Sequence, residues 1–185
     1  MTTTTAEPGR AAAPALGQLN SIQLNIVTLV HLQRASATGT LEGSLFMMDN
    51  SVGGTGQGTG RLETVCKQGQ VLNWIIRPIE MDKRPDGNWP PMPKITSLVF
   101  LDPEETDAQQ VATKRITSEL KIYGMPDKMR SPYTPVYYYW AGTILPTAQP
   151  GLYRYRLVVE LEQDGGKDPL YLNTEDNPAL RIIGM

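Results

Sequence analysis

The side chains that most often perform enzyme chemistry are scarce in this sequence. Its 185 residues include one histidine, His31, and one cysteine, Cys66. A single histidine excludes multi-histidine metal sites and leaves one imidazole to act as a general base. His31 falls inside a strand-like run and has no nucleophile-elbow motif beside it. We therefore interpret it as a strand histidine whose ring is satisfied by a backbone or solvent partner.

The cysteine has a reactive and a structural interpretation. Cys66 is followed directly by Lys67, and a nearby lysine can lower the pKa of a thiol and so produce a nucleophilic thiolate. Its position in a strand favours the structural interpretation, a small buried hydrophobe. One cysteine allows neither an intrachain disulfide nor a thiolate metal cluster, so packing must hold the fold together.

Four acidic residues around Pro103 offer a third route to catalysis. Two carboxylates that converge in a cleft can hydrolyse glycosides. Charged residues are also common in solvated turns, and no aromatic box follows this segment in the sequence. We therefore interpret the group as a turn. Its members are Asp102, Glu104, Glu105 and Asp107.

A glycine-rich stretch, Gly53 to Gly60, invites comparison with a phosphate-binding loop. No Gly-Lys-Ser/Thr sequence closes it, and no amphipathic helix follows to supply an N-terminal dipole. The sequence favours a flexible loop between two strands.

Aromatic residues are the best candidates for a binding or interface role. The run Tyr137 to Trp140, as a strand, places Tyr138 and Trp140 on one face and the other two tyrosines on the opposite face. One pair fills the core, and the other packs under a loop, stacks on a sugar ring or joins a subunit interface. In a proline-rich loop, Trp89 either caps the core or anchors a ligand. The predicted ligand or interface residues are Trp89, Tyr138 and Trp140.

The charge balance lacks the footprint of a nucleic-acid-binding protein. Lys and Arg total 17 against 19 acidic residues, which gives a net charge of -2. A DNA or RNA binder carries a basic face that releases counterions from phosphate. No apolar stretch approaches the roughly 20 residues that span a bilayer, and residues 1–18 lack the form of a secretory signal. We expect a cytoplasmic protein with no nucleic-acid partner, no membrane partner, no metal and no cofactor.

The elements that must position these residues are predicted to be strands. Alternation is clearest from Tyr153 to Leu161, where one face is apolar and the other is mostly charged. A strand from Ile22 to Val30 turns apolar on both faces toward its end. Shorter runs, bounded by turn residues, cover Leu41–Met48, Leu62–Cys66, Val71–Ile76, Ile95–Leu101, Val111–Tyr123, Val136–Ile144, Leu170–Leu172 and Leu180–Ile183.

About nine or ten strands at this spacing predict an all-β fold, an antiparallel β-sandwich of immunoglobulin-like or jelly-roll-like type. Residues 1–18 hold few large apolar groups, so we expect a flexible, disordered tail before a single domain over residues 19–185. One helical turn is expected near Pro103 to Gln109, where acidic residues follow a proline.

Several motifs together resemble one protein family. They are Phe46-Met47-Met48-Asp49-Asn50, Gly56-Gln57-Gly58-Thr59, Leu62, Gly69, Val71-Leu72-Asn73-Trp74, the strand Tyr153 to Leu161, and Asp176-Asn177-Pro178-Ala179-Leu180-Arg181-Ile182. This set resembles the bacterial inclusion body protein family, the AidA and PixA group, over roughly Leu19 to Met185. Gln70 departs from the pattern, because family members often carry Asp after this glycine. The family's Trp-Asp-Pro is likewise spread here over Asp176 to Pro178.

The resemblance implies a compact β-sandwich without an established catalytic activity, associated with cytoplasmic inclusions or quorum-controlled expression. We expect a non-enzymatic inclusion-body or storage-type protein that forms homo-oligomers through strand edges or an aromatic patch. The alternative is a carbohydrate-binding, lectin-like module that stacks a sugar on an exposed aromatic residue, with calcium as an optional ligand.

Overall fold

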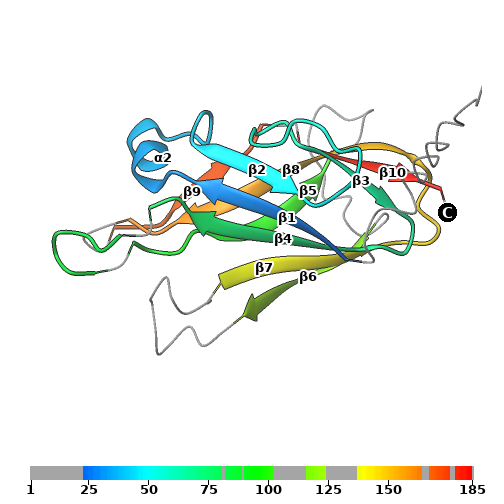
Figure 1. The fold of residues 1–185 in the computed structure, drawn as a ribbon. Helices are drawn as coiled ribbons and strands as arrows, with labels where there is room; N and C mark the ends of the chain where they lie inside the picture. Colours follow the sequence, from blue (N-terminus) through cyan, green and yellow to red (C-terminus); the bar gives the residue numbers. More distant parts are fainter. Residues whose placement is uncertain are drawn as a thin grey trace, which may run out of the picture.

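Strands dominate the computed structural model. It describes residues 23–80, 82–88, 90–101, 116–123, 137–163, 167–175 and 178–184. For residues 116–123 and 137–138 it describes the backbone alone. The elements in chain order are β1 (Gln23–Val30), α2 (Leu32–Thr38), β2 (Leu45–Asp49), β3 (Glu63–Lys67), β4 (Val71–Pro78), β5 (Lys94–Phe100), β6 (Ile116–Tyr123), β7 (Tyr137–Ile144), β8 (Gly151–Leu161), β9 (Leu170–Asn173) and β10 (Ala179–Ile183) (Figure 1). The prediction of a mostly β fold with about nine or ten strands is confirmed.

The strands form two sheets. One has the order β2-β1-β4-β7-β6, and the other has the order β3-β10-β8-β5. The long strand β8 pairs with β5 along one side and with β10 and then β9 along the other. The prediction of an antiparallel fold is wrong for two pairs, because β1 runs parallel to β4 and β3 runs parallel to β10. Both pairs join segments far apart in sequence, and such long crossovers permit parallel pairing. The immunoglobulin-like or jelly-roll-like assignment stays a prediction.

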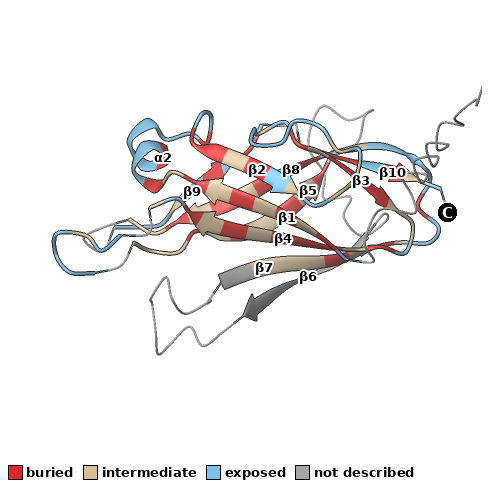
Figure 2. Cartoon of the chain, in the orientation of Figure 1, coloured by how far each residue is buried: buried red, intermediate tan, exposed pale blue. Residues whose placement is uncertain are grey.

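The two sheets share one hydrophobic core. Register places Ile26, Trp74 and Trp140 in one row across the first sheet, and Figure 2 shows buried residues recurring along its strands. The edge of the Trp74 ring meets Tyr155 of the second sheet, with 6.0 Å between ring centroids and 82° between ring planes. Tyr155 also packs on Phe100 at 5.9 Å. Edge-to-face aromatic pairs add about 1 kcal/mol beyond the area they bury, so this stack fixes how the sheets meet.

Helix α2 was not predicted, and it shortens a predicted strand. The run predicted over Leu41 to Met48 becomes a strand only at Leu45, after the helix and a turn. The helix ends at Gly39, whose φ of 68° is left-handed and whose N–H donates to the Ala35 carbonyl. Leu32 and Ala35 face the core, so two apolar contacts anchor its single buried face.

Some predictions lie outside the described residues. They are the tail of residues 1–18, the helical turn of Pro103 to Gln109, the acidic group around Pro103 and the beginning of the strand predicted from Val111. Within the described part of the chain, no helix is long and apolar enough to cross a membrane.

Two buried threonines give a matched test of core packing. The Thr28 hydroxyl is fully buried and has no hydrogen-bond partner, whereas the Thr174 hydroxyl accepts from the Leu157 N–H at 2.9 Å. A buried polar group without a partner costs about 1–3 kcal/mol. Thr28→Val should therefore raise the free energy of unfolding by about 1 kcal/mol. Thr174→Val should lower it by about the same amount, because the buried Leu157 N–H then loses its acceptor.

Urea unfolding of both variants, followed by circular dichroism, checks this pair. A Thr28→Val protein that is less stable than the parent would show that the hydroxyl is satisfied in the core.

Candidate functional site

Of the three aromatic residues predicted to bind, the structure describes the side chain of Trp140 alone. Trp140 is partly buried against the core, and its indole N–H donates to the Ile95 carbonyl of the opposite sheet at 2.7 Å. Tyr138 lies in β7, where the backbone alone is described, and Trp89 lies outside the described residues. The indole hydrogen bond of Trp140 links the two sheets. A ligand or interface role for these residues stays a prediction.

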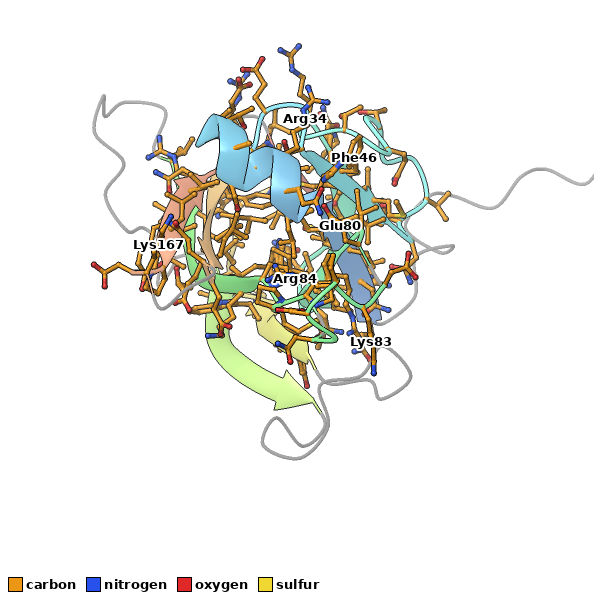
Figure 3. All side chains as sticks on the ribbon, turned by 90° about the vertical axis from the view of Figure 1, so that its left-hand side faces the viewer. Arg34, Phe46, Glu80, Lys83, Arg84 and Lys167 are labelled. Atoms are coloured by element: carbon orange, nitrogen blue, oxygen red, sulfur yellow. The ribbon has the colours of Figure 1, made fainter. Side chains whose placement is uncertain are left out.

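The single histidine begins a helix, and its assignment to the interior of a strand is wrong. His31 is the N-cap residue of α2, and its side chain makes no capping bond to the helix. The cap is supplied by Glu80, whose carboxylate accepts from the N–H groups of Leu32 at 3.0 Å and Gln33 at 3.2 Å. His31 Nδ1 lies against Glu80 Oε1, and the contact is an ion pair when the imidazole is protonated. Figure 3 shows Glu80 beneath the helix, where it fills the role of a local capping side chain.

The stabilisation that Glu80 gives to α2 depends on pH. Partial burial raises the pKa of this carboxyl, but the helix N–H groups and the His31 charge outweigh it and hold the pKa below the ordinary value of 4.5. A lowered folded-state pKa means that the stabilisation is complete above the unfolded-state pKa and is lost as the pH falls through the folded-state value.

Glu80→Ala should lower the free energy of unfolding at pH 7 by about 1 kcal/mol, the usual cost of losing a helix cap. The difference in the free energy of unfolding between parent and variant should narrow as the pH falls below 4.5, because the parent carboxylate becomes protonated as the pH passes its lowered pKa. Glu42→Ala, which removes an exposed glutamate from the loop after α2, is the control. Urea titrations from pH 7 to pH 3 measure both; a gap that does not vary with pH would contradict the role of the charge.

The cysteine is structural, as the strand position indicated. Cys66 is fully buried, and its Sγ lies 3.8 Å from the Arg181 carbonyl oxygen. Burial, with a smaller contribution from the Asp49 charge, raises the pKa of the thiol to about 12. A thiol that stays protonated at neutral pH is a poor nucleophile.

The native protein should therefore react with a thiol reagent such as DTNB at pH 8 only as fast as it unfolds. The urea-unfolded chain should react at the rate of a free cysteine. Rapid, stoichiometric reaction of the native protein would overturn the assignment.

The glycine-rich segment seals sheet edges instead of binding phosphate. At the outer edge of β2, Met47 N–H donates to the Thr59 carbonyl at 3.2 Å, and Gly58 N–H donates to the Met47 carbonyl at 2.7 Å. At the outer edge of β3, Thr55 and Glu63 exchange two backbone hydrogen bonds of 3.0 and 2.9 Å. The loop is thus bonded to both sheets along its length.

Glycine is required where this loop turns. Gly56 has a φ of +73°, and a Cβ there would meet the Arg61 carbonyl oxygen at 2.3 Å. Side chains complete the seal, because Ser51 Oγ accepts from the Val65 N–H at 3.2 Å. Unpaired edges are sites of association with other chains, so this loop removes two of them.

A cleft of about 310 Å³, lined about equally by polar and apolar surface, opens beside β9. It lies between the turn after α2, the end of the glycine-rich loop and the end of β9. Leu41 and Leu45 supply apolar surface, and charged and amide groups supply the rest; the lining is Thr40, Leu41, Glu42, Gly43, Leu45, Thr59, Gly60, Arg61, Asn173, Thr174 and Glu175. These residues come from three separate segments, so sequence spacing gave no signal for them. Neither a thiol nor an imidazole is among them, and the arrangement suits contact better than chemistry.

No group of three or more His, Cys, Asp or Glu side chains gathers to hold a metal in the part of the chain that the structure describes.

Comparisons with known proteins gave one family model and two solved structures to report. A family model described as Domain of unknown function (DUF8788) matches residues 22–85, the span of β1 to β4. No curated protein sequence matches the chain. Among solved structures, an inclusion body protein (PixA) from Burkholderia cenocepacia J2315 matches with a TM-score of 0.51 and 10% identity, over 88% of this chain and 95% of that chain. The solution structure of amebosin matches with a TM-score of 0.27 and 9% identity, over 65% of this chain and 88% of that chain.

The likeness to the PixA structure confirms, at the level of the fold, the resemblance seen in the sequence. At 10% identity it concerns the arrangement of the strands and not individual side chains. The chain has the fold of an inclusion body protein.

Proposed function

We propose that this chain is a non-enzymatic, inclusion-body or storage-type protein of the cytoplasm that acts by associating with copies of itself. The observation that carries the proposal is the fold shared with the PixA inclusion body protein over 95% of that protein's chain. Fold alone does not fix function, so the chemistry of the described side chains must agree with the proposal.

The described side chains agree with a role in association. Cys66 is buried, and its raised pKa keeps the thiol protonated. His31 is held against Glu80 at the start of α2, where the pair stabilises the helix. Several large apolar side chains remain at least one third exposed, namely Met48, Ile79, Leu152 and Tyr171. In the proposed association, a second copy covers such side chains and removes their apolar surface from water.

Native mass spectrometry and light scattering over a wide concentration range test the proposal. We expect oligomers that grow in population as the concentration rises. Monomers alone at every concentration would contradict self-association.

In the same proposal, a fluorescently tagged chain expressed in bacteria gathers into cytoplasmic inclusions, and its natural transcript rises with cell density, as quorum control requires. A diffuse fluorescence signal would contradict the formation of inclusions, and a constant transcript level would contradict quorum control. The carbohydrate-binding alternative gains no specific support from the described residues and remains a prediction from the sequence. Glycan-array screening with and without a chelator tests it.

A further inference from the structure

Among the residues that the structure describes, strand β9 pairs only with β8, so its other edge is open. In its pairing with β8, Leu172 lies opposite Val159, and Leu170 lies opposite Leu161. Just beyond the strand, Thr174 N–H donates to the Leu157 carbonyl at 3.0 Å. Backbone groups in a strand point alternately to either side, so those of residues 170, 172 and 174 face β8. The N–H and C=O groups of Tyr171 and Asn173 therefore face away from the sheet.

The side chains along this edge alternate in the same way. Leu172 is buried, with 7% of its surface exposed, whereas Tyr171 is 57% exposed and Asn173 is also exposed. The Tyr171 hydroxyl donates to Glu160 Oε2 at 3.3 Å, which holds the ring along the outer surface of β8. The cleft of about 310 Å³ lies beside the last residue of the strand, Asn173.

Of the other edge strands, β2, β3 and β5 are covered or interrupted. The glycine-rich loop covers β2 and β3, and Lys67 N–H at the end of β3 donates to Gln70 Oε1 at 3.0 Å. Strand β5 has a bulge between Ile95 and Ser97, and the Ile95 carbonyl accepts from the Trp140 indole. Bulges and covering groups are two of the means of stopping edge-to-edge pairing. Among the described residues, β9 has neither a bulge nor a covering group.

The charges around β9 are self-complementary. Lys167 stands four residues before Tyr171, and Glu175 stands four residues after it. When two copies of an extended strand pair antiparallel about Tyr171, each Lys167 lies directly opposite the partner's Glu175. Both side chains then share the outer face with Tyr171, because residues two apart in a strand share a face. Figure 3 shows Lys167 beside β9, across the molecule from Lys83.

We propose that two copies of this chain pair through β9 in an antiparallel, two-fold symmetric arrangement centred on Tyr171. The inference rests on the proposed function and names the surface through which self-association begins. Tyr171 exchanges two hydrogen bonds with the partner's Tyr171, and Asn173 N–H donates to the partner's Pro169 carbonyl. Pro169 has no N–H of its own, and an edge strand is where a proline is tolerated. The same patch on both copies makes the contact, so it closes at a dimer, the unit of any larger assembly.

Hydrogen exchange on the full chain tests the edge directly. We expect the amides of Tyr171 and Asn173 to exchange rapidly at low protein concentration and to become protected when the dimer forms. The amide of Leu172, which faces β8, should be protected under both conditions.

A charge swap tests the register. Lys167→Glu places two carboxylates opposite each other at both ends of the pair and should weaken the dimer about tenfold, as should Glu175→Lys. The double variant Lys167→Glu/Glu175→Lys restores opposite charges and should recover the parent affinity. Lys83→Glu, an exposed lysine remote from β9, is the control for net charge and should leave the affinity unchanged.

Tyr171→Pro gives a second, independent variant. Its proline replaces an N–H that faces outward, so the fold should be retained and the dimer lost, with circular dichroism as the check on folding.

The outcomes separate the two proposals. A parent protein that is monomeric at all concentrations would overturn the proposed function. A parent that associates while the Tyr171 and Asn173 amides stay unprotected, or while the double variant fails to recover the loss in the single variants, would overturn the β9 pairing alone.

Discussion

The need to satisfy the backbone groups at the edges of two sheets governs much of this structure. An unpaired N–H or C=O is costly when buried and adhesive when exposed. The chain meets this need with groups from outside each strand's own ladder: the glycine-rich loop on β2 and β3, the indole of Trp140 in β7 on β5, and the Thr174 hydroxyl on β8. Glu80 does the same for the first turn of α2. The strands form the two layers. These side chains and loops determine which strand edges remain free to pair with another chain.

The alternation of apolar residues predicted the strands well, because period-two burial is a local property. Tyr153 to Leu161 is the clearest case, and it became β8, the strand that pairs with three others. Parallel pairing of β1 with β4 was not predictable, since it depends on which distant segments meet. Helix α2 was missed for a related reason: its cap comes from a glutamate 48 residues away from Leu32, and sequence signals for caps are local.

The candidate site shows the same division. Buried Cys66 could be assigned from its neighbours, whereas the cleft brings together residues from three segments that no spacing rule connects. Aromatic residues were the predicted binding residues, yet the single N–H donor of the Trp140 indole bonds within the molecule, to the Ile95 carbonyl. The strand at Leu170–Leu172 was predicted from its residues, but which of its sides pairs with β8 depends on the tertiary fold.

The parallel pairing of β3 with β10 also bears on how the chain is made. Cys66 and Arg181, which meet across this pair, are 115 residues apart. During synthesis β3 emerges early and has no neighbouring strand until β10 leaves the ribosome, so the second sheet completes late. The glycine-rich loop, adjacent to β3 in sequence, can shield its other edge in the meantime. Until β10 has been made, the nascent chain therefore exposes one edge of β3, and crowding on a polysome would favour contact between such chains.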